Sequence, residues 1–187
     1  MLDNHDTISL LVPDVYYIYG GCTHPHVRPS SEAYLAHPTL PGSRYLCLEI
    51  CSRKIARKGD AVLNLFYVTE ANVQGTTLEV LENATILEDL RRIRDTAAAR
   101  FGIEKVVIIP HINLRCRSGT RIPDRDDLYR FLTEGQTEFD VIDITRFIER
   151  ERPELCLEDV LGDGYHYSHK MGELARACIL EYFAGKV

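Results

Sequence analysis

Four short runs of apolar residues are spaced along the chain, and each is bounded by glycine, proline or polar residues. The runs cover residues 15–19, 61–68, 105–114 and 139–144. They are rich in β-branched and aromatic residues, and their apolar positions are nearly continuous rather than alternating. This pattern is typical of strands that are covered on both faces of a sheet. We therefore predict four buried strands.

Helical spacing of apolar residues occurs between and after these runs. The predicted helices cover residues 44–57, 78–101, 123–134 and a C-terminal segment that includes 174–183. Thr77 is a candidate N-cap for the long second helix, and Gly102 is a typical residue for its C-terminal end. Pro123 stands at the first helical position, where proline is favoured.

Strands that alternate with helices predict a parallel sheet between two layers of helices. We expect a three-layer α/β/α fold with a mainly parallel sheet, of flavodoxin-like type. The sequence contains no repeat, low-complexity tract or linker, which predicts one domain over residues 1–187. In such folds, ligands bind at the carboxyl ends of the strands. The polar residues expected at this edge of the sheet are Cys22, Asn72, His111, Asn113, Arg115, Asp163 and His166.

Composition and charge exclude several classes of partner. The 187 residues carry a net charge of −6, so there is no basic excess to attract nucleic acid or an anionic membrane surface. No apolar run approaches the roughly 20 residues of a membrane-spanning helix, and the N-terminal residues lack the basic start of a secretory signal. We therefore expect a cytoplasmic protein with neither nucleic acid nor membrane as a partner. Its six cysteines are then expected to be thiols.

Three residues are candidates for nucleophilic chemistry. Asp163 and His166 stand three residues apart before the last predicted helix. A histidine there can act as a general base while the aspartate accepts from its other ring nitrogen. Asp163 can instead cap a turn, with His166 on the surface. Cys22 follows the first strand and two glycines, where backbone N–H groups can stabilise a thiolate and an oxyanion, or it can be a small buried apolar residue.

In element order and length, most of the chain resembles the SGNH/GDSL hydrolase superfamily. That family has a nucleophile directly after the first strand and a D-x-x-H block before the last helix. Residues 163–166, Asp-Gly-Tyr-His, match the second block. Residues 21–23, Gly-Cys-Thr, occupy the first block with cysteine in place of the usual serine, as in branches with a G-x-C first block. The resemblance implies a triad of Cys22, His166 and Asp163.

The same resemblance implies an oxyanion hole. The family has a glycine and an asparagine as oxyanion donors, the latter in a G-x-N-D type block after the second strand. This chain has Thr-Glu-Ala-Asn at residues 69–72, which makes Asn72 the candidate amide donor and leaves the glycine missing. Gly42 is assigned as the other donor by position alone. Arg115, among several arginines after the third strand, either holds an anionic group of the substrate or belongs to a solvated basic loop.

The leading hypothesis is an acyl ester or thioester hydrolase or acyltransferase that forms a covalent acyl intermediate on Cys22. Its substrate is a small-molecule or carrier-bound acyl group, and the chemistry needs no cofactor and no metal. One alternative is a catalytically degenerate relative that only binds a ligand or a partner protein. Another is a metal-dependent hydrolase in which Cys22, His24 and His26 are ligands, with His37 or His111 completing the set.

Overall fold

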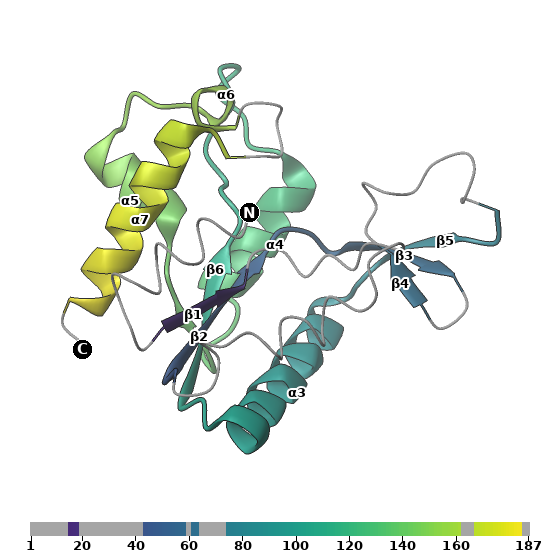
Figure 1. The fold of residues 1–187 in the computed structure, drawn as a ribbon. Helices are drawn as coiled ribbons and strands as arrows, with labels where there is room; N and C mark the ends of the chain where they lie inside the picture. Colours follow the sequence, from purple (N-terminus) through teal and green to yellow (C-terminus); the bar gives the residue numbers. More distant parts are fainter. Residues whose placement is uncertain (1–14, 19–42, 59–60, 64–73, 162–166, 185–187) are drawn as a thin grey trace.

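The computed structural model describes residues 15–18, 43–58, 61–63, 74–161 and 167–184. Four parallel strands form its main sheet. They are β1 (Val15–Ile18), β2 (Tyr45–Ile50), β6 (Lys105–Pro110) and β7 (Asp140–Val141). Their order across the sheet is β1-β2-β6-β7, which follows the order of the chain (Figure 1). The predicted parallel sheet is confirmed, with β1, β6 and β7 among the predicted strands, whereas β2 was not predicted as a strand.

Helices cover both faces of this sheet. They are α3 (Asn83–Phe101), α4 (Pro123–Thr133), α5 (Ile144–Glu151), the short α6 (Leu157–Val160) and α7 (His169–Phe183). Successive residues of a strand point to opposite faces, so Leu46 and Leu48 pack with α3 and α4, whereas Tyr45 and Cys47 pack with α5 and α7. The three-layer α/β/α arrangement is therefore confirmed.

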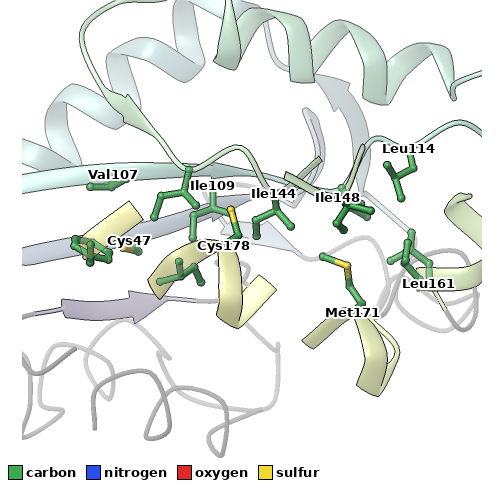
Figure 2. Close-up of a cluster of buried hydrophobic side chains, with 14 of the residues drawn as sticks. Cys47, Val107, Ile109, Leu114, Ile144, Ile148, Leu161, Met171 and Cys178 are labelled. Atoms are coloured by element: carbon green, nitrogen blue, oxygen red, sulfur yellow. The ribbon is translucent and has the colours of Figure 1, made fainter. Parts of the chain in front are cut away.

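Figure 2 shows part of the hydrophobic core between the main sheet and helices α5 and α7. Met171 and Cys178 of α7 lie in the same cluster as Val107 and Ile109 of β6, and Ile148 brings α5 into it. These five side chains are at most 7% exposed. Burial of both faces explains why β6 is a continuous apolar run in the sequence.

The predicted helix at residues 44–57 is wrong, because this segment forms β2 and the start of a second sheet. Apolar residues at Leu46, Cys47, Ile50 and Cys51 fit one helix face as well as they fit a strand, and short apolar runs do not separate the two. The segment becomes a strand because it pairs with β1 on one side and β6 on the other. That pairing involves residues far apart in sequence.

A small antiparallel sheet lies to one side of the main sheet (Figure 1). It consists of β3 (Lys54–Lys58), β4 (Ala61–Leu63) and β5 (Thr77–Val80), in the order β4-β3-β5. Residues 61–63 were predicted as the start of a strand in the parallel sheet, and they instead pair with β3; residues 64–68 lie outside the described residues. Thr77 is not a helix cap but the first residue of β5, and α3 begins six residues later.

The end of α3 and the start of α4 agree with the prediction. The sequence did not predict α5 or α6, and α5 begins at Ile144, the last residue of the predicted strand at residues 139–144. Gly102 ends α3 in a left-handed conformation with φ of 71°, and Pro123 occupies the first turn of α4. None of the helices that the structure describes is both long and apolar enough to cross a membrane.

Replacing Gly102 with alanine is expected to lower the free energy of unfolding by about 1–2 kcal/mol, because a Cβ strains the left-handed conformation. Gly172 is the matched control: it lies inside α7, and a Cβ there would meet nothing within 4 Å. Gly172→Ala is expected to raise the free energy of unfolding by about 0.5–1 kcal/mol. Denaturant unfolding of both variants checks the pair, and shifts of the same sign would contradict it.

Candidate functional site

Three polar side chains meet at the carboxyl ends of β2 and β6. Glu49 is the penultimate residue of β2, His111 directly follows β6, and Tyr167 lies just before α7. The carboxylate Oε1 of Glu49 is 2.8 Å from Nδ1 of His111. The hydroxyl of Tyr167 donates to the same carboxylate oxygen and lies 3.0 Å from Nδ1 of His111. We call these three residues the edge cluster.

Local backbone structure fixes each member of the edge cluster. The N–H of His111 donates to the carbonyl of Ile50 at 3.0 Å, which extends the pairing of β2 and β6 by one residue. Tyr167 forms an isolated bridge with Leu161. Ser168, the next residue, caps α7 by accepting from the N–H of Met171. The start of α7 therefore holds Tyr167 at the edge of the sheet.

Two members of the edge cluster are buried and Tyr167 is partly buried. The side chain of Glu49 is 0% exposed and that of His111 is 6% exposed, and the ring of Tyr167 stacks on the imidazole with centroids 5.0 Å apart. A buried carboxylate needs donors to offset its desolvation, and the imidazole N–H and the phenol O–H supply them. When Nδ1 carries the proton that Glu49 accepts, Nε2 of His111 is the basic nitrogen. The arrangement can therefore orient an imidazole for proton transfer.

Cys51 adds a thiol to this site. It follows the end of β2, and its Sγ, a ring nitrogen of His111 and a carboxylate oxygen of Glu49 all lie within 4.8 Å of one another. Cys51 is partly exposed and, together with His111, lines a small hollow that also includes Arg125 and Tyr129. Thiolate, imidazole and carboxylate are the groups that bind zinc in proteins, so these residues are able to hold a metal ion.

A second polar network fixes the segment after His111. The backbone N–H of Asn113 donates to the hydroxyl of Thr145 at 2.9 Å, and its side-chain amide donates to Asp126 at 2.8 Å. Arg121 donates to the carbonyl of Asn113 and, at 2.5 Å, to the carboxylate of Glu149. Asn113 is fully buried, and its Oδ1 has no hydrogen-bond partner among the described residues. Its side chain is therefore used to fix the loop.

The residues predicted to carry catalysis, Cys22, Asp163 and His166, lie outside the described residues, as do the predicted oxyanion donors Gly42 and Asn72. His24, His26 and His37, the alternative metal ligands, also lie outside the described residues.

Arg115 is described and exposed. Its guanidinium donates to the carbonyl of Gly119 at 3.1 Å, so it helps to close its own loop. Its neighbour Arg117 pairs with Asp159 at 2.9 Å, and hydrogen bonds to Cys156 and Asp159 raise the pKa of Arg117. A role for Arg115 in binding substrate stays a prediction.

Glu49, Cys51 and Tyr167 are the members of the site that the sequence did not predict, whereas His111 was expected at this edge. Glu49 is the single charged residue of the apolar run at residues 45–50. A carboxylate inside a buried strand needs a partner, and this signal was hidden because residues 44–57 fit a helix. Tyr167 had no signal beyond its position next to His166.

The buried thiols of the core are expected to resist alkylation in the native protein. Burial raises the pKa of Cys47, which is 0% exposed, and burial with the nearby carboxylates of Asp143 and Glu181 raises the pKa of Cys178 to about 12. Few of these thiols are thiolates near neutral pH, so iodoacetamide should modify them only after unfolding. Peptide mapping after native and denatured labelling checks this, with partly exposed Cys116 as the internal control. Labelling of Cys47 as fast as that of Cys116 would contradict it.

Comparisons with known protein families and with curated proteins found no match to the chain.

Proposed function

We propose that the chain transfers or hydrolyses acyl groups of esters or thioesters through a covalent intermediate on Cys22. His166 accepts the thiol proton and Asp163 orients its imidazole. The Cys22 sulfur forms a bond to the acyl carbon, the bond to the leaving alcohol or thiol breaks, and His166 returns the proton to that leaving group. A second nucleophile then attacks the thioester while His166 takes its proton. The carbon–sulfur bond breaks, the acyl product leaves, and His166 returns the proton to the Cys22 sulfur.

The position of Tyr167 is the observation that carries the proposal. Tyr167 directly follows His166 in the sequence, and its hydroxyl donates to Glu49 at the carboxyl end of β2. The D-x-x-H block is thus joined to a residue at the edge of the sheet where α/β folds bind their ligands. A block on the opposite edge, or on the outer face of a helix, would argue against catalysis.

The pairing of β1 with β2 indicates that the segment leading to Cys22 leaves the sheet at the same edge. Ile18, the last residue of β1, pairs in parallel with Leu48, so the chain leaves β1 on the side of the sheet that carries Glu49. Cys22 stands four residues further along the chain. Backbone N–H groups at Cys22 and Gly42, with the amide of Asn72, are the proposed oxyanion donors. Arg115 is a proposed contact for an anionic part of the acyl substrate.

Intact-protein mass spectrometry after incubation with a panel of activated acyl esters and thioesters tests the proposal. Wild type is expected to gain one acyl mass, Cys22→Ala none, and His166→Ala an adduct that forms more slowly by about 10²–10⁴-fold. Cys116→Ala is the matched control and is expected to behave as wild type. Decay of the adduct on addition of amines or alcohols separates transfer from hydrolysis.

Three results would overturn the assignment. An adduct that persists in Cys22→Ala would place the nucleophile elsewhere. An adduct lost in His111→Gln but formed at the normal rate in His166→Ala would assign the base to the edge cluster. Absence of any adduct on wild type across the panel would favour the alternative of a domain that binds without catalysis.

A further inference from the structure

We propose that Glu49, Cys51 and His111 form a binding site for a divalent transition-metal ion, best matched by Zn²⁺, with Tyr167 beside its fourth coordination position. This site differs from the metal site considered from the sequence, which involved Cys22, and it does not depend on the proposed acyl chemistry.

The topology of the sheet brings the three ligands together. β2 and β6 are parallel neighbours, and Ile50 pairs with Pro110. The backbone hydrogen bond from His111 to Ile50 continues this pairing, so Cys51 and His111 follow at the same level. Cys51 directly follows β2, and its Sγ lies within 4.8 Å of ligand atoms of both Glu49 and His111. Two adjacent strand ends thus present three different ligand groups to one point.

The measured separations suit a single ion. The three ligand atoms lie within 4.8 Å of one another, and the carboxylate of Glu49 is 2.8 Å from Nδ1 of His111. Zinc binds sulfur at about 2.3 Å and nitrogen or oxygen at about 2.0–2.2 Å, so tetrahedral ligand atoms lie roughly 3.3–3.8 Å apart. Glu49 and His111 therefore separate slightly when the ion replaces the proton between them. Cys51, which is partly exposed, would complete the same tetrahedral spacing with its Sγ.

Charge balance favours a divalent ion at this place. Carboxylate and thiolate together carry two negative charges, and neutral imidazole carries none, so a divalent ion makes the buried group electrically neutral. Metal binding offers a buried carboxylate a stronger partner than a neutral donor does. Three protein ligands leave one coordination position open, as in catalytic rather than structural zinc sites.

Tyr167 places a phenol hydroxyl next to two of the three proposed ligands. Its hydroxyl contacts both Glu49 and His111 Nδ1, the two ligands that the ion would join. A ligand or water in the fourth position would therefore lie within reach of a phenol that can donate a proton. Hydrogen bonds from such neighbours orient metal ligands and tune affinity.

Titration of the full-length, reduced protein with Zn²⁺ against a chromophoric chelator tests the site. Wild type is expected to bind one equivalent. Cys51→Ser and His111→Gln each remove a ligand. Each is therefore expected to weaken Zn²⁺ binding by at least about 10–100-fold, the loss that is typical when only a residue supporting a ligand is changed. With Co²⁺ as the probe, wild type should show a thiolate-to-metal charge-transfer band that Cys51→Ser lacks.

Two matched variants decide which thiol is the ligand. Cys156→Ser removes another partly exposed cysteine and should bind as wild type. Cys22→Ala should also bind as wild type, and this arm separates the site from the proposed acyl nucleophile. Failure of wild type to bind one equivalent, or loss of binding in Cys22→Ala but not in Cys51→Ser, would overturn the proposal. Neither result would affect the acyl-adduct experiment, which uses no metal.

Discussion

Replacing Glu49 with alanine is expected to lower the free energy of unfolding by about 3–5 kcal/mol, the cost of removing one partner of a buried pair. The Glu49 side chain is 0% exposed and accepts from both His111 and Tyr167. Without it, an imidazole and a phenol would stay at the edge of the sheet without their shared acceptor, next to a cavity of the size of the lost side chain. Denaturant unfolding followed by circular dichroism measures the change.

Two further variants separate the lost hydrogen bonds from the lost volume. Glu49→Gln keeps an acceptor oxygen and nearly the same volume, so it is expected to cost less than half as much as Glu49→Ala. Tyr167→Phe removes one donor while it retains the ring that stacks on His111, and it is expected to cost about 1–3 kcal/mol. Equal losses in Glu49→Gln and Glu49→Ala would contradict a role of the carboxyl group as shared acceptor.

Phe183→Ala is expected to lower the free energy of unfolding by about 3–5 kcal/mol, as large-to-small changes of buried aromatic residues do. Phe183 is the last residue of α7 and is 1% exposed. Its ring packs edge-on against Tyr45 of β2 with centroids 5.1 Å apart, and against Tyr182 at 4.9 Å. Alanine would remove these contacts and leave a cavity between the last helix and the sheet. Thermal and denaturant unfolding measure the loss.

Phe147→Ala provides the control for Phe183→Ala. Phe147 lies on α5 at the margin of the same core, and it is only partly buried. Its ring already faces solvent in part and lies under the guanidinium of Arg150. Because less apolar area returns to water, its truncation is expected to cost about half as much or less. A larger loss for Phe147→Ala than for Phe183→Ala would contradict the proposed position of the core.

Most of the α/β architecture was predictable because it depends on patterns within single segments. The continuous apolar run of β6 indicates a buried strand without reference to the rest of the chain. Gly102 marks a helix end because it adopts the left-handed conformation, and Pro123 marks a helix start because its φ is fixed. The same local signals failed at residues 44–57. There a strand and a helix explain the apolar spacing equally well, and only the neighbours β1 and β6 decide between them.

The sequence by itself determined the fold class, a sheet between two layers of helices, and the position of His111 after the strand that became β6. Composition and strand–helix alternation are enough for this, since they follow from which segments must be buried. Only the tertiary structure decided that Glu49, His111 and Tyr167, residues up to 118 positions apart, share a hydrogen-bonded cluster. Strand pairing and register bring such residues together, and no local pattern in the sequence specifies either.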